Sequence, residues 1–64
     1  MSLKEIARKY LEGERQREKG IKEDDKSLYS RGSGLIFEAV NEFQKSGESQ
    51  EILFGEVERL SKEG

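Results

Sequence analysis

A Gly-Ser-Gly segment at residues 32–34 comes closer to a phosphate-binding loop than any other part of this sequence. Glycines let backbone N–H groups approach an anion, and such loops hold phosphates at the start of a helix. A P-loop also needs a lysine that is not present here, and the dinucleotide-binding fingerprint needs glycine where this chain has Phe37. The segment therefore predicts a helix start, with Ser33 as N-cap and the glycines acting as a hinge.

Three consecutive acids, Glu23, Asp24 and Asp25, form the densest set of potential metal ligands. A calcium loop alternates its ligands and carries a central glycine, and this run has neither feature, so a solvated acidic turn is expected. The chain has no histidine and no cysteine. The usual zinc ligands and most nucleophile–base pairs are therefore missing, and we expect no metal, no cofactor and no enzymatic activity.

The elements that would present a site have little apolar material with which to form a core. Leu, Ile, Val and Phe make up 15 of the 64 residues, whereas 41% of the chain is charged. A single domain of this size hides only about 60% of the surface that its unfolded chain exposes. Without cysteine, no disulfide can supplement the core. We expect one domain over residues 1–64, either a minimal helical bundle or a chain that orders fully only on a partner or in a dimer.

Apolar residues at helical spacing predict an all-α, three-helix arrangement whose first helix covers about residues 3–19. Ser2 and Glu5 have the spacing of a capping box at its start. Gly20 is a natural C-terminal stop.

A second helix is expected over about residues 34–46 and a third over about residues 49–63. The connection at residues 46–49 is short, and short connections join antiparallel neighbours. We therefore predict that the second and third helices pair as the stable hairpin and that the first helix lies across them.

A charged, mobile connection is predicted at residues 20–32. Eleven of the sixteen residues from 12 to 27 are charged, and Ile21 is the single apolar residue among them. Such a segment offers nothing to a core, although a compact domain rarely contains a structureless loop of this length.

Three large apolar side chains fall beside the helical stripes and are predicted to bind a partner: Phe37, Ile52 and Phe54. Exposed aromatic residues of this kind are common anchors of protein interfaces. We therefore expect a small protein–protein interaction module, such as an adaptor, regulator or inhibitor of a larger assembly. A self-associating structural helical bundle is a further alternative.

An alternative function is suggested by the uneven distribution of charge. The net charge is −2, yet residues 1–22 hold seven bases against four acids. The first helix could therefore serve a nucleic-acid-associated helical module, because basic clusters bind phosphates. The basic residues singled out for this role are Arg8, Lys9, Arg15, Arg17 and Lys19.

The first residues also bear on location. Acidic and basic residues are mixed with apolar ones from the N-terminus onward, unlike a signal peptide, and no apolar run approaches the ~20 residues of a membrane span. We expect a cytoplasmic protein with no membrane partner.

Overall fold

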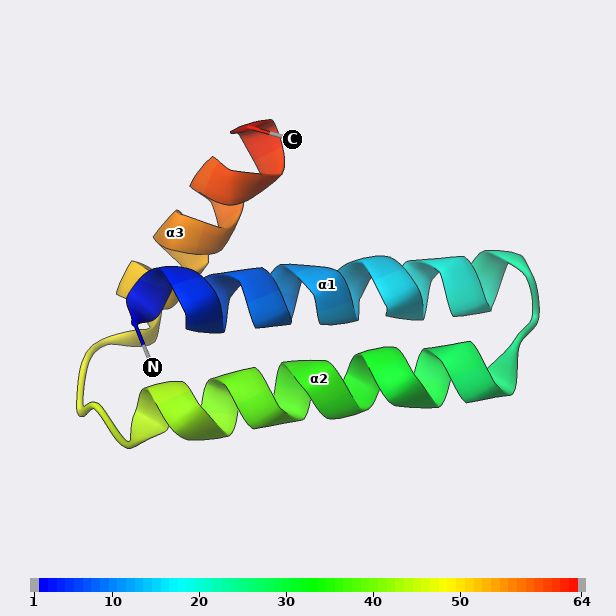
Figure 1. Cartoon of the computed structure of the whole chain (residues 1–64), viewed down its shortest axis with the longest axis horizontal. Coiled ribbons are helices and arrows are strands. Elements are labelled where there is room, and N and C mark those ends of the chain that lie inside the picture. Colours follow the sequence, from blue (N-terminus) through cyan, green and yellow to red (C-terminus); the bar gives the residue numbers. More distant parts are fainter. Residues whose placement is uncertain (1, 64) are drawn as a thin grey trace.

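The chain folds into three helices and, over the described residues 2–63, forms no strand. In the computed structural model these are α1 (Leu3–Lys22), α2 (Lys26–Gln44) and α3 (Gln50–Glu63). α1 and α2 form a long antiparallel hairpin, and α3 lies on the side of α1 away from α2 (Figure 1). The predicted all-α three-helix arrangement is confirmed. Within residues 2–63, no helix is long and apolar enough to cross a lipid bilayer.

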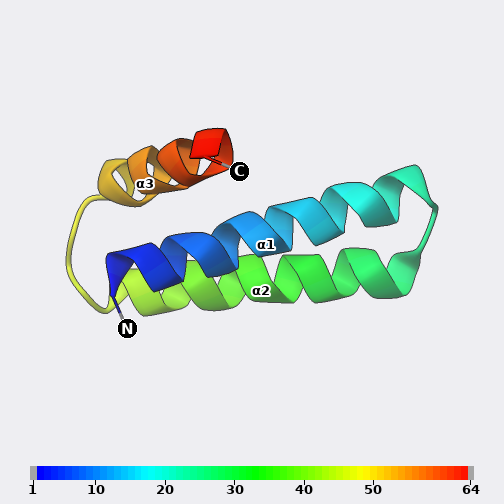
Figure 2. The same ribbon diagram turned by 45° about the horizontal axis from the view of Figure 1, so that its top comes forward.

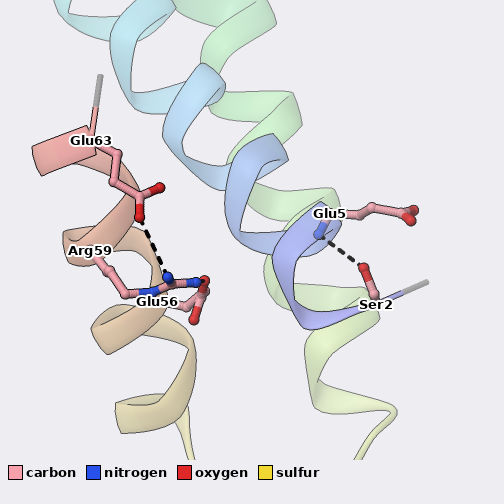
Figure 3. Close-up of polar contacts among 5 residues, drawn as sticks. All are labelled: Ser2, Glu5, Glu56, Arg59 and Glu63. Atoms are coloured by element: carbon pink, nitrogen blue, oxygen red, sulfur yellow. Dashed lines mark hydrogen bonds and ion pairs between the residues drawn. The ribbon is translucent and has the colours of Figure 1, made fainter.

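At the start of α1, Ser2 takes the N-cap position of the predicted capping box, and the bond from the backbone of Glu5 is the half of the box that forms. The Oγ of Ser2 accepts a hydrogen bond from the backbone N–H of Glu5 at 3.3 Å (Figure 3). The helix does not stop at Gly20 but continues to Lys22, where the N–H of Glu23 donates to the carbonyl of Lys19 at 2.9 Å. Basic residues in the last turn interact favourably with the negative end of the helix dipole.

The predicted long connection at residues 20–32 is wrong, because helix covers all of it except residues 23–25. Asp24 takes a left-handed conformation with φ of 52°, which reverses the chain within a few residues. Asp25 is the N-cap of α2 and accepts from the N–H of Leu28 at 3.2 Å. Ser33, predicted to cap the second helix, therefore lies inside α2.

Buried glycines explain how so polar a segment can pack. A Cβ added to Gly32 would lie 2.5 Å from the backbone nitrogen of Arg17 and 2.5 Å from the carbonyl oxygen of Gly13. A Cβ on Gly20 would lie 2.6 Å from the nitrogen of Tyr29. The two backbones touch at these points, so α1 and α2 pack closely at the glycines, and the side chain of Ile36 packs beside Gly13. Local sequence rules predict helix breaks at these glycines, whereas in the fold they form the contact between two helices.

The apolar core lies at one end of the hairpin. Its members are Ile6, Ala7, Ala39, Phe43, Leu53, Val57 and Leu60. α3 contributes to this core by packing on α1 and scarcely touches α2, so the predicted pairing of the second and third helices is wrong. The connection contains Gly47 with φ of 76° and carries the chain past the end of α2 to α1. Toward the turn at residues 23–25 the hairpin has no third helix over it (Figure 2).

Candidate interaction surface

The three predicted partner-binding side chains are all exposed. Phe37 is 74% exposed on α2, and Ile52 and Phe54 are 46% and 45% exposed on α3. Successive helical residues are rotated by about 100°, so Ile52 and Phe54 leave α3 on opposite sides of the buried Leu53. These residues therefore do not form one patch, and their role in binding stays a prediction.

Phe54 has a structural contact as well as an exposed face. Its ring meets the ring of Tyr10 edge to face, with centroids 5.7 Å apart and an interplanar angle of 66°. Such aromatic pairs add about 0.5–1.5 kcal/mol beyond the area that they bury. Desolvation by burial, together with the nearby Glu14 carboxylate, raises the pKa of Tyr10 above its ordinary value of 10.0. Phe54 therefore helps to hold α3 on α1.

Phe37 stands at the centre of an uncharged surface, which we name the Phe37 face. Its members recur at helical spacing along α2, and all are exposed or half-buried: Ser30, Ser33, Gly34, Phe37, Val40 and Asn41. In a chain that is 41% charged, a helical face of this length without a charge is unusual. The apolar pattern of the sequence predicts that Phe37 is exposed. The same pattern pairs the second helix with the third and therefore places Val40 in the core.

The charges of α2 beyond its first turn lie together on another edge. Arg31, Glu38 and Glu42 are separated by seven and four residues, which places them on one side of the helix. Lys9 of α1 bridges to this edge, with its Nζ 3.1 Å from Oε2 of Glu38 and 3.4 Å from Oε1 of Glu42. The hydrogen bond that Lys9 donates to Glu38, with a smaller contribution from Glu42, raises the pKa of Lys9 above its ordinary value of 10.5. Charge is thus segregated from the Phe37 face.

The basic residues predicted for nucleic-acid binding divide into two groups. Arg8, Arg15 and Lys19 are exposed and share one face of α1. Lys9 is occupied by its two glutamates, and Arg17 is half-buried where its backbone approaches Gly32. The five basic residues predicted for nucleic-acid binding therefore do not form one surface in the fold.

Two further lysines complete the exposed basic row on α1. The row comprises Lys4, Arg8, Arg15, Lys19 and Lys22, all exposed, and within residues 2–63 none of them forms an ion pair. We name this the α1 basic row.

On α3, by contrast, the bases are paired along their own helix. Arg59 contacts the carboxylates of Glu56 and Glu63, the latter at 3.4 Å (Figure 3). Lys62 lies 3.5 Å from Glu58. The bases of these pairs are exposed, so solvent screens the pairing and it adds little stability, but it leaves α3 without a free basic surface.

The acidic run at residues 23–25 serves the turn between α1 and α2. One carboxylate oxygen of Asp25 caps α2, and Asp24 adopts the left-handed backbone conformation that turns the chain. Across residues 2–63, no group of three or more His, Cys, Asp or Glu side chains is placed to hold a metal ion.

Comparison of the chain with protein-family models, with curated proteins and with solved structures gives no match. Functional inference therefore depends on the chain's own residues.

Proposed function

We propose that this chain is a small protein–protein interaction module, an adaptor, regulator or inhibitor within a larger assembly, and that it binds through the Phe37 face. The observation that supports this proposal most is the 74% exposure of Phe37 at the centre of an uncharged helical face. An aromatic side chain left in water gains free energy when a partner covers it, and such anchors dominate many interfaces.

Affinity capture with matched variants tests the proposal. The immobilised chain is exposed to lysate of its source cells, and retained proteins, including further copies of the chain itself, are identified by mass spectrometry. We expect Phe37→Ala to weaken the retained interaction by about 30-fold, since truncating a hot-spot aromatic costs about 2 kcal/mol. Ile21→Ala is the control, because Ile21 is 65% exposed but lies outside the Phe37 face. Equal capture by both variants and the parent chain contradicts the proposal.

A second candidate function is supported by the α1 basic row. Its five bases extend over 19 residues of one helix, about 28 Å, which suits the phosphate backbone of a nucleic acid. The test is titration with a mixed-sequence duplex at two salt concentrations. On this alternative, replacing Arg8, Arg15 and Lys19 by Gln reduces the salt slope by about 0.9 for each phosphate that is no longer neutralised. Replacing Lys9 and Arg17 by Gln is the control and leaves the slope unchanged.

A further inference from the structure

We propose that the partner of the Phe37 face is a second copy of this chain, whose α2 packs antiparallel against it to give a dimer of helical hairpins. This inference rests on the proposed function, since it names the occupant of the same surface. The supporting observations concern the shape, the register and the charge of α2.

The Phe37 face carries a protrusion and a recess side by side. Ser30, Ser33, Gly34 and Phe37 have the spacing i, i+3, i+4 and i+7, which defines the four corners of a hole in helix packing. Three of these corners are small, and a Cβ added to Gly34 would meet nothing within 4 Å. The ring of Phe37 projects from the same face. A two-fold interface requires the same patch to supply both shapes, and this patch does.

The register places the two-fold axis near the middle of α2. The hole is centred between Ser33 and Gly34, so the ring of Phe37 enters the hole of the second copy when the axis passes near residue 35. Residue 35 is also the midpoint of α2, which runs from residue 26 to residue 44. The helices then overlap over their whole length of about 28 Å, and the two Phe37 rings lie on either side of the axis.

Charge is complementary in this same register. In an antiparallel pair about a two-fold axis, each edge of one helix meets the same edge of the other. Arg31 then lies opposite the interval between Glu38 and Glu42 of the second copy. Both carboxylates belong to the edge that carries Arg31, and the side chain of Glu38 is 61% exposed despite its bridge to Lys9. No like charges meet near the axis, because the Phe37 face has none.

A second copy also provides what the single hairpin lacks. The core of buried apolar residues lies at the α3 end, and the half near the turn is a pair of helices whose buried glycines mark close contacts. Packing of a second α2 adds a helical layer along that half. Helices of this length are marginal in water on their own, and most of their stability comes from packing against other elements.

Sedimentation equilibrium of the full chain from micromolar to millimolar concentration tests this inference, with circular dichroism at low concentration as the check of folding. We expect a monomer–dimer equilibrium that Phe37→Ala weakens by about 30-fold. Gly34→Lys fills the recess and places like charges near the axis, so it should abolish the dimer. Gly55→Lys is the matched control, since Gly55 is also an open helical glycine but lies on α3, and it should leave dimerisation unchanged.

A charge exchange tests the antiparallel register. Arg31→Glu and Glu38→Arg should each weaken the dimer a few-fold, and the double variant should restore it. Failure of the double variant to restore the dimer overturns the register, and a dimer insensitive to Gly34→Lys overturns the interface. A parent chain that stays monomeric throughout overturns the inference as a whole. The proposed function survives that last outcome if Phe37→Ala still reduces capture from lysate, and falls if it does not.

Discussion

At the scale of single residues, the glycines of this chain have two different surroundings. Gly13, Gly20 and Gly32 are buried where α1 and α2 touch, so each of them replaces a side chain that would not fit. Gly34 and Gly55 stand in open space on the helix surface. Because they lack a side chain, these two glycines lower helix stability, and no other part of the chain packs closely against them.

Gly32→Ala and Gly55→Ala should therefore change stability in opposite directions. The new Cβ at Gly32 meets backbone atoms at 2.5 Å, and overpacking of this kind costs about 1–3 kcal/mol. At Gly55 the Cβ meets nothing, and better helix propensity should raise the free energy of unfolding by about 0.5–1 kcal/mol. Urea denaturation of both variants measures the difference. Equal effects would mean that the two helices do not approach so closely.

Phe43 and Phe37 should respond differently to truncation although both lie on α2. Phe43 is 1% exposed in the core, and Phe43→Ala should cost about 3–5 kcal/mol, enough to threaten folding. Phe43→Leu provides a milder second variant. Phe37 is 74% exposed, and Phe37→Ala should change the unfolding free energy by less than about 0.5 kcal/mol at concentrations where the chain is monomeric. Thermal melts showing equal losses would contradict the assignment of faces.

At the scale of elements, α3 is attached to the hairpin through α1. Leu53, Val57 and Leu60 enter the core, and the contact between Tyr10 and Phe54 extends the attachment along one side. The desolvated hydroxyl of Tyr10 gives this docking a spectroscopic signal.

Titration of Tyr10 should report the docking of α3. In a Tyr29→Phe background, ultraviolet absorbance should give Tyr10 a pKa above 10.0, because burial raises it. Phe54→Ala exposes the ring and should move the pKa toward 10.0. Ile52→Ala, on the other side of α3, should leave it unchanged, and an effect as large as that of Phe54→Ala would disprove the assignment.

The same group makes stability depend on pH in a defined direction. The pKa of Tyr10 is higher in the folded chain than in the unfolded one, so its contribution is fully present below about pH 10. That contribution is lost as the pH rises through the folded pKa. Tyr10→Phe should therefore show a smaller alkaline loss of stability than the parent chain when urea denaturation is repeated across this range.

At the scale of the whole molecule, packing is unevenly distributed. The chain measures 35 by 24 by 17 Å, and its buried apolar side chains gather at the end where all three helices meet. At the other end the charged halves of α1 and α2 meet closely at buried glycines. Local opening is easiest where buried apolar contacts are fewest, so the turn end should open before the core end.

Amide hydrogen exchange should show this gradient. We expect measurable protection at residues 27–35, since they are helical, but stronger protection at residues 38–43 next to the core. Exchange at unfolded-chain rates throughout residues 20–32 would instead support the long mobile connection that the sequence pattern indicates. Protection around Phe37 that increases with protein concentration would in addition support the dimer.

The sequence by itself determined the helical class, the N-cap at Ser2 and the exposure of Phe37. These features follow from local rules, because helical periodicity, N-cap chemistry and the offset of a side chain from an apolar stripe are all encoded within a few turns. The fold also confirmed the approximate positions of the first and third helices.

Only the tertiary structure decided which helices pair. The local sequence around Gly20 and Gly32 does not distinguish a helix end from a helix–helix contact. The contact depends on backbone atoms 5 to 19 residues away along the chain. A glycine weakens an isolated helix. Here it also lets α1 and α2 come so close that an added Cβ would lie 2.5–3.0 Å from atoms of the other helix or the turn. The apolar stripes likewise do not indicate whether α3 packs against α1 or against α2. That choice depends on where the glycine-paired hairpin leaves Ala7 and its neighbours uncovered, which is a property of the assembled helices and not of any one segment.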